Sequence, residues 1–327
     1  MKGLIHILLA AALGGAGAFT AGRFGVRFGL VDRPSERSSH YRPTPKGGGI
    51  GILAAFCVAA IWIGLPVLVW LPVAGLSLAS LVGDRMELSA KLRLGLQFAA
   101  AGIACWGIAK LFPAGIFWKS SGLALWLLGA SFFVVATANI FNFMDGINGI
   151  AGITGIVAFA LLAGTGWMRG ESHAWVLVAA TLAASCAGFL PWNFPKARVF
   201  MGDVGSILLG FVFAVFVLAW SRTLSDLLMF AAFLFPFYAD ELVTLIPRLR
   251  DGDSLIRPHR RHIYQILVNQ MGVTHWKVSL LYGIIQLGVA GGALLLYPLG
   301  WVAEMAWMGL VLGASWILAS RVRRHEA

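Results

Sequence analysis

Eleven long apolar segments, nearly free of charged residues, restrict what this chain can fold into. They are residues 3–22, 47–65, 66–82, 96–113, 121–140, 147–168, 173–191, 205–221, 224–247, 276–298 and 299–320. A helix needs about 20 apolar residues to cross the hydrocarbon core of a bilayer. Only 12% of the residues are charged, whereas soluble domains carry about 25%. We therefore expect an all-α polytopic transmembrane bundle that forms one domain over residues 1–327. Ten spans are the alternative to eleven, because the second and third segments meet at Pro66.

The distribution of basic residues predicts the orientation of the bundle. If the N-terminus lies outside, 20 of the 25 lysines and arginines fall in cytosolic segments, as the positive-inside rule requires. The C-terminus is then cytosolic. This surplus explains the net charge of +11 without a nucleic-acid partner, because a basic cytosolic face meets anionic lipid headgroups and anionic substrates. We expect a multi-pass protein of the inner (cytoplasmic) membrane, for which a homodimer remains open.

Acidic residues share this bias, and topology rules do not explain it. Eleven of the 14 aspartates and glutamates fall in cytosolic loops or at the cytosolic ends of spans, although acids contribute little to membrane orientation. Charge at the edge of the hydrocarbon is costly and usually functional. The bias therefore predicts an active site at the cytosolic face that is built from several loops.

Asp145 lies between two apolar spans, in the string Asn142-Phe143-Met144-Asp145-Gly146-Ile147-Asn148-Gly149. The glycines allow a tight turn and a close approach of the backbone to a ligand. The asparagines can bond freed backbone groups or a nucleobase. The structural alternative is a helix-end turn in which Asp145 only faces water.

Asp203 precedes another apolar span and follows a loop that contains Asn193, Lys196, Arg198 and Phe200. Flanking glycines leave its carboxylate open to a metal, and Mg²⁺ favours one or two carboxylates together with phosphate oxygens and water. The two basic residues of the loop can bind anionic oxygens, and Phe200 can stack on a base. The alternative role for Asp203 is a helix N-cap, which is compatible with metal binding.

The last large loop carries the basic string Arg257-Pro258-His259-Arg260-Arg261-His262. If this string is helical, His259 and His262 face the same way, because they are three positions apart. Two histidines and several arginines beside a membrane suit phosphate binding. A zinc site is not expected, since no cysteine or third histidine lies nearby. The alternative is a basic cluster that contacts only lipid headgroups.

These strings resemble the polyprenyl-phosphate N-acetylhexosamine-1-phosphate transferase superfamily, of the glycosyltransferase family 4 type, over about residues 30–265. The resemblance rests on the first loop from Leu30 to Gly49, on Leu88–Arg93 with Gln97, and on the strings around Asp145, Asp203 and His259–His262, in the order of the family. The histidine string is similar to that of the branch that starts O-antigen and other surface polysaccharides. There are two departures: Gly83-Asp84 stands where the family usually has paired aspartates, and Asn148-Gly149 stands where it often has Asp-Gly.

The resemblance implies an enzyme that transfers a sugar-1-phosphate from a UDP-sugar to undecaprenyl (polyprenyl) phosphate and releases UMP. Mg²⁺, with Mn²⁺ as the alternative, is the implied cofactor. The implied catalytic residues are Asp84, Asp145, Asp203, His259 and His262, with Asp203 as the metal ligand. The implied substrate-binding residues are Lys46, Lys91, Asn142, Asn193, Phe200 and Arg260. Among these, Lys91 would offset negative charge, and Asn193 and Phe200 would contact the nucleotide.

Three questions stay open at this point. A secondary transporter would also be polytopic, although its ionisable groups should lie near the middle of the bilayer. An inactive scaffold of the same fold is the second alternative, because Gly83 removes one carboxylate of the family's acidic motif. The sugar is also open among GlcNAc, FucNAc, QuiNAc and other N-acetylated hexoses.

Overall fold

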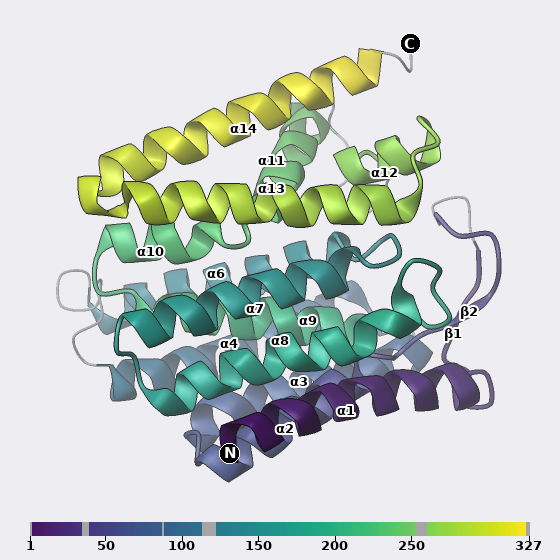
Figure 1. Ribbon diagram of the computed structural model, residues 1–327, viewed down its shortest axis with the longest axis horizontal. Helices are drawn as coiled ribbons and strands as arrows, with labels where there is room; N and C mark the ends of the chain where they lie inside the picture. Colours follow the sequence, from purple (N-terminus) through teal and green to yellow (C-terminus); the bar gives the residue numbers. More distant parts are fainter. Residues whose placement is uncertain are drawn as a thin grey trace.

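The protein is almost entirely helical over the part that the computed structural model describes, which is residues 2–34, 39–86, 88–112, 122–250, 252 and 260–324 (Figure 1). The helices are α1 (Lys2–Phe24), α2 (Ile50–Ile63), α3 (Val67–Met86), α4 (Ala90–Leu111), α6 (Leu123–Phe143), α7 (Ile150–Met168), α8 (His173–Asn193), α9 (Asp203–Trp220), α10 (Leu224–Ala232), α11 (Phe235–Arg250), α12 (Ile263–Asn269), α13 (His275–Leu296) and α14 (Trp301–Arg324). The short helix η1 (Tyr297–Leu299) joins the last two. Strands β1 (Val31–Asp32) and β2 (Thr44–Pro45) pair antiparallel.

Each of the eleven apolar segments falls on helix, but not every such helix is long enough to be a span. Eight helices are long and apolar enough to cross a membrane, and α10 with α11, bent by 87°, makes a ninth candidate. Helix α2 and the Val67–Gly83 part of α3 are shorter. Helix α2 ends after 14 residues because Gly64, with φ 72°, adopts the left-handed conformation that terminates helices. By length and composition, the described residues therefore contain eight or nine candidate spans and two shorter apolar helices. The expected count of ten or eleven spans stays a prediction.

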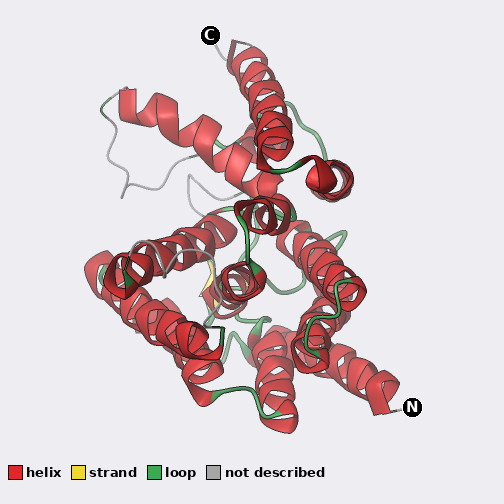
Figure 2. Cartoon of the chain, turned by 90° about the vertical axis from the view of Figure 1, so that its left-hand side faces the viewer, coloured by secondary structure: helices red, strands yellow, loops and turns green. Residues whose placement is uncertain are grey.

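Helix α9 lies at the centre of the bundle. It packs against α2, α3, α4, α6, α7 and α10, and 89% of its candidate span is buried, against 17% for α14. Figure 2 shows the resulting ring of helices around a central one. The C-terminal helices α10, α11, α13 and α14 pack against one another beside this ring, and α13 joins them to it through α7.

Helices α1 and α8 approach each other at backbone distance. A Cβ atom on Gly14 would lie 2.0 Å from the carbonyl oxygen of Ser185, and one on Gly188 would lie 1.9 Å from that of Ala11. Any larger residue would push these helices apart. Small residues thus provide the close van der Waals packing that holds helices together where lipid replaces water.

The loops that carry the strings singled out in the sequence gather at one end of the bundle, at the right in Figure 1. We call this the hairpin end; it comprises β1 and β2, the α6–α7 turn (residues 144–149), the α8–α9 loop (residues 194–202) and α12. Hydrogen bonds join these segments to one another. Gly48 donates its N–H to the carbonyl oxygen of Phe200 at 2.9 Å, and the Tyr264 hydroxyl donates to that of Phe143 at 2.9 Å.

The opposite end is held by ion pairs. Arg169 contacts Asp226 at 2.6 Å, and Arg222 contacts Glu171 at 2.9 Å. These pairs connect the α7–α8 turn with the link between α9 and α10. The two ends of the bundle therefore differ in chemistry, and only the hairpin end collects the strings that the sequence singled out.

Candidate active site

Asp203 begins α9 at the hairpin end and is hydrogen-bonded through both carboxylate oxygens. Its Oδ2 accepts from Nη1 of Arg93 at 2.9 Å, and its Oδ1 accepts from Nδ2 of Asn142 at 2.9 Å. The side chain is still 25% exposed. The aligned peptide dipoles of α9 favour a negative charge at its N-terminus. Asp203 thus links α4, α6 and α9 at the position expected to hold a metal.

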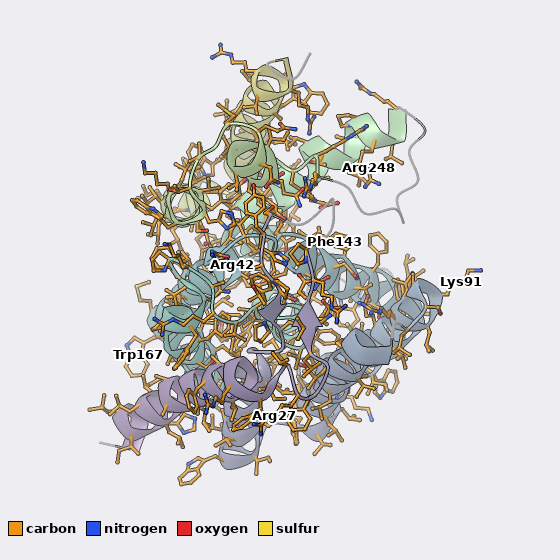
Figure 3. All side chains as sticks on the ribbon, turned by 90° about the vertical axis from the view of Figure 1, so that its right-hand side faces the viewer. Arg27, Arg42, Lys91, Phe143, Trp167 and Arg248 are labelled. Atoms are coloured by element: carbon orange, nitrogen blue, oxygen red, sulfur yellow. The ribbon has the colours of Figure 1, made fainter. Side chains whose placement is uncertain are left out.

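Arg93, in the first turns of α4, bridges two elements of the site. Its Nη1 bonds Asp203, and its Nη2 donates to the carbonyl oxygen of Gly83 at 3.1 Å, near the end of α3. Lys91, expected to offset negative charge, is exposed and points away from the bundle in Figure 3. Two helical positions correspond to about 200° of rotation, so the two basic residues cannot face the same way. Helical periodicity could have identified Arg93 as the basic residue of the site, because Arg93 lies four positions before Gln97 and on the same face of α4.

A cavity of about 590 Å³ lies beside Asp203, between α3, α4, α6 and α9. Arg93, Asn142 and Asp203 form one polar patch on its wall, and Gln97 and Asn139 form a reciprocal pair of amide hydrogen bonds at 2.6 and 3.3 Å. Most of the remaining lining is apolar, including Leu76, Leu94, Phe98, Phe132, Val135, Phe143 and Ile207. This combination suits a molecule with an anionic head and a hydrocarbon body.

Asp145 lies in the tight turn between α6 and α7. Its N–H donates to the carbonyl oxygen of Asn142 at 3.1 Å, which closes the turn. Asn142 also ties the turn to α9, because its Nδ2 donates to Ser206 Oγ at 2.8 Å in addition to Asp203. Burial, together with the negative charge of Asp203, raises the pKa of the Asp145 carboxyl well above its ordinary range. The turn therefore places a second carboxylate within electrostatic reach of Asp203.

The acidic residues of the hairpin end fit a hard divalent cation that substrate oxygens help to hold. Among the described side chains, no group of three or more His, Cys, Asp or Glu residues could hold a metal ion by itself. Mg²⁺ needs only one or two carboxylates when phosphate oxygens and water complete its shell. A cation at this position would offset the repulsion between Asp145 and Asp203. Asp84 lies at the C-terminal end of α3, and its side chain is outside the described residues.

Asn193, expected to contact the nucleotide, holds two loops together. The residue is only 4% exposed. Its Oδ1 accepts from the N–H of Gly149 at 2.7 Å, and its Nδ2 donates to the carbonyl oxygen of Val199 at 2.9 Å. Both ends of the amide therefore bond backbone, which stabilises the Asp145 turn and the α8–α9 loop against each other. A direct contact with nucleotide stays a prediction.

The glycine run of the first loop packs against the start of α9. Gly49 donates its N–H to the carbonyl oxygen of Met201 at 2.9 Å, and a Cβ on Gly49 would lie 2.5 Å from Cα of Gly205. This close approach explains the glycines without a phosphate. Lys46, just before them, is half-buried, and its N–H donates to the carbonyl oxygen of Leu30 at 3.0 Å.

Phe200, the expected stacking residue for a base, is half-buried at the hairpin end. Its ring makes an edge contact with His40, with centroids 4.9 Å apart. His40 also lies 3.8 Å from a carboxylate oxygen of Asp32. The first loop therefore holds the Phe200 ring in place. Stacking of a nucleotide base on this ring stays a prediction.

The basic string of the last loop divides into parts with different surroundings. His262 is 3% exposed, and its ring lies between two carboxylates of α11, with Nδ1 3.4 Å from Asp240 and Nε2 3.7 Å from Glu241. These contacts hold His262 against α11. Arg260 is half-buried. His259 lies outside the described residues, so its predicted role in catalysis is not placed.

The comparisons with known proteins agree with this geometry. The model of the family described as Glycosyl transferase family 4 matches residues 66–221, which run from the start of α3 to the end of α9. A decaprenyl-phosphate N-acetylglucosaminephosphotransferase of Mycobacterium leprae is 29% identical over 330 residues, covering 83% of this chain and 80% of the relative. An undecaprenyl-phosphate alpha-N-acetylglucosaminyl 1-phosphate transferase of Escherichia coli K12 is 29% identical and covers 90% and 83%.

A third relative, with the same name as the second, comes from Yersinia pestis. It is 27% identical, and the match covers 94% of this chain and 91% of the relative. The matched region contains Arg93, Asp145 and Asp203, and the relatives extend over the C-terminal helices as well. The helical bundle, the hairpin-end site and these likenesses lead to one assignment. The chain is a multi-pass membrane protein whose residues 66–221 match the model of glycosyl transferase family 4.

Proposed function

We propose that this protein transfers an N-acetylhexosamine 1-phosphate from a UDP-sugar to a polyprenyl phosphate, and so starts a lipid-linked glycan of the cell envelope. One observation carries the proposal: Asp203 and Arg93, bonded to each other, lie on the wall of a largely apolar cavity. A lipid phosphate needs a cation for its head and an apolar groove for its chain. The relatives that cover most of the chain carry this activity in their names.

The reaction exchanges one phosphoanhydride for another. An oxygen of the lipid phosphate forms a bond to the sugar-linked phosphorus of the UDP-sugar, the bond from that phosphorus to the oxygen of UMP breaks, and UMP leaves. Such transfers depend mainly on positioning and on neutralising charge. Mg²⁺, when bound, would lower the negative charge of the diphosphate. Asp203 would hold the ion, and Asp145, in the turn between α6 and α7, would orient the attacking lipid phosphate or accept its proton.

Arg93 supplies the positive charge on the acceptor side. It already bonds Asp203 and the Gly83 carbonyl oxygen, so its guanidinium is held at the cavity by two partners. A guanidinium can bind phosphate through two parallel hydrogen bonds. The apolar lining between α4 and α6 would then accept the first isoprene units of the carrier. Lys46, Arg260 and His259 remain predicted contacts for the donor phosphates or sugar. Asp84 remains the predicted alternative to Asp145 for orienting or deprotonating the lipid phosphate.

The topology of the proposal follows the charge distribution. The segments expected in the cytosol hold 20 of the 25 lysines and arginines and include the loops of the hairpin end, which favours placement of this end in the cytosol, where UDP-sugars are made. The N-terminus would then lie outside and the C-terminus inside. N-acetylglucosamine is the first sugar to test, because it is the sugar in the names of the relatives. A homodimer stays a prediction.

The experiment is a reconstitution with purified protein in lipid nanodiscs, undecaprenyl phosphate, Mg²⁺ and a panel of UDP-N-acetylhexosamines. We expect release of UMP and of a lipid diphosphate sugar with one sugar of the panel. Asp203→Ala should lose more than about tenfold in rate, because it removes a charge-bearing ligand. Glu171→Gln, at the opposite end of the bundle, is the matched control and should keep its rate.

Two outcomes would replace the proposal. No UMP from any sugar, with a folded protein and all substrates present, would indicate an inactive scaffold. Uptake of an intact UDP-sugar by proteoliposomes, without UMP release, would indicate a transporter.

A further inference from the structure

Helix α13 carries a stripe of polar side chains along an otherwise apolar span. His275, Ser279, Tyr282 and Gln286 follow one another at intervals of four, three and four residues, which places them on one face of a helix. Ser279 is 0% exposed, Tyr282 7% and Gln286 1%. The stripe lies C-terminal to the region that the family model matches. Polar groups in a membrane helix are costly unless each one finds a partner, so the partners indicate what the stripe does.

Two members of the stripe bind the backbone of one residue in the Asp145 turn. The N–H of Asn148 donates to Nδ1 of His275 at 3.2 Å, and Oγ of Ser279 donates to the carbonyl oxygen of Asn148 at 2.8 Å. Helix α13 therefore holds Asn148 from both its donor and its acceptor side. Asn148 is three residues after Asp145, so this double contact fixes the far half of the turn.

The other two members of the stripe bind α11 and the break between α10 and α11. Tyr282 donates its hydroxyl to Asp240 of α11, and the same carboxylate accepts the N–H of Ile263 at 2.9 Å, at the start of α12. Gln286 donates to the carbonyl oxygen of Phe233 at 2.7 Å, at the break between α10 and α11. In Figure 1, α13 runs the length of the bundle and reaches the hairpin end beside α12. Helix α13 thus connects the Asp145 turn with α11 and the start of α12, which flank the basic string of residues 257–262.

We propose that His275 and Ser279 are positioning residues of the transferase, which set the distance of Asp145 from Asp203 by fixing the backbone of Asn148 on both sides. The inference rests on the proposed function for its kinetic consequences, but the contact itself can be tested without activity. Neither residue touches substrate, so their loss should lower the catalytic rate more than substrate binding. A misplacement of about 1 Å in a reacting group can cost about 100-fold in rate.

Asparagine is the conservative replacement for His275. Nδ1 of His275 accepts an N–H, so it carries no proton itself. An asparagine has its Oδ1 acceptor two bonds from Cβ, as histidine has Nδ1, whereas alanine has no acceptor. His275→Asn should therefore restore what His275→Ala loses. His173 provides a matched control, because it too is the first residue of a long helix after a hydroxyl N-cap residue, and it lies exposed in α8.

The first measurement is hydrogen exchange by mass spectrometry on the peptide that contains residues 144–149. We expect exchange to be at least about fivefold faster in His275→Ala and in Ser279→Ala than in the parent protein, because each loses one hydrogen bond of the turn. His275→Asn and His173→Ala should exchange at the parent rate. Unchanged exchange in both alanine variants would sink the proposal, whatever the enzymatic activity is.

The second measurement is the UMP-release assay. We expect kcat to fall about tenfold or more in His275→Ala, with KM for the UDP-sugar within about twofold, and to recover in His275→Asn. Equal kcat in the parent and in both alanine variants would overturn the positioning role while leaving the proposed function intact. An inactive parent protein would overturn the proposed function alone. If His275→Ala does not fold, the comparison of Ser279→Ala and His275→Asn with the parent decides the question.

Discussion

Arg93 and Asp203, 110 positions apart in the sequence, form an ion pair of 2.9 Å on the wall of the cavity between α3, α4, α6 and α9. The pair brings a cation and a proposed metal ligand into one hydrogen-bonded unit. The second guanidinium nitrogen reaches Gly83, at the position where the family usually has the first of two aspartates. At this position the chain therefore has a hydrogen bond from an arginine side chain to a backbone carbonyl oxygen.

Arg93 should be more important for activity than Lys91. Arg93→Gln removes a charged hydrogen-bonding group, a change that typically costs about 1.5–3 kcal/mol, so the rate of UMP release should fall at least about tenfold. Arg93→Lys keeps the charge but loses the planar fork, and an intermediate rate is expected. Rates at saturating substrate, measured over a Mg²⁺ titration, test this. A larger loss in Lys91→Gln than in Arg93→Gln would return the charge-neutralising role to Lys91.

His262 should contribute to stability before it contributes to catalysis. Its ring lies between the buried carboxylates of Asp240 and Glu241. Removing one partner of a buried ionic contact typically costs about 3–5 kcal/mol, because charges remain unpaired. We expect His262→Ala to lower the unfolding temperature, and Glu241→Gln in the same protein to restore part of the loss. Thermal unfolding followed by tryptophan fluorescence tests this. A variant as stable as the parent but with a raised KM for UDP-sugar would place His262 against substrate instead.

Gly49 should resist even the smallest enlargement. Its Cβ would lie 2.5 Å from Cα of Gly205, a backbone atom that cannot rotate away, so α2 and α9 would have to separate. Overpacking of this kind costs about 1–3 kcal/mol, and it would also displace the start of α9. Gly75→Ala is the control: no atom lies within 4 Å of its Cβ, and alanine in a helix is favoured over glycine by roughly 0.5–1 kcal/mol. Unfolding temperatures should therefore move in opposite directions. Equal shifts for the two variants would contradict the close contact.

The stability of the folded protein should depend on pH through Asp145, and Asp145→Asn should lack this dependence. Burial and Asp203 raise its pKa, so the folded state binds this proton more tightly than the unfolded chain, and protonation favours folding. That contribution is complete below the ordinary carboxyl pKa of about 3.9 and is lost as the pH rises through the raised pKa of the folded protein. The wild type should therefore lose stability relative to Asp145→Asn from about pH 4 upward.

Unfolding temperatures of the two proteins, compared across pH in the absence of divalent ions, measure this difference. Adding Mg²⁺ should reduce it at neutral pH, because a cation near Asp145 and Asp203 favours the ionised form. Parallel curves for the wild type and Asp145→Asn would mean that Asp145 titrates as an ordinary exposed carboxyl.

The amino-acid sequence by itself determined the class of the fold and predicted which loops would hold the site. Apolar runs select helices of about membrane length, and this property is local, so each expected segment falls on helix. The strings around Asp145 and Asp203 also indicated that these carboxylates belong together. The ends of the helices were harder to predict: Gly64 ends α2 after 14 residues, a conformational detail that hydropathy does not register.

Tertiary structure decided which side chains meet. Arg93 rather than Lys91 faces Asp203 because the rotation of α4 about its axis is set by packing against α3, α6 and α9. The carboxylate neighbours of His262 come from α11, and the partners of His275 and Ser279 come from a turn more than 120 residues earlier. Local pattern establishes that a helix forms and which of its faces is polar. The partner of each polar group depends on how helices far apart in the chain pack together, because a polar group in hydrocarbon must find its partner within the protein.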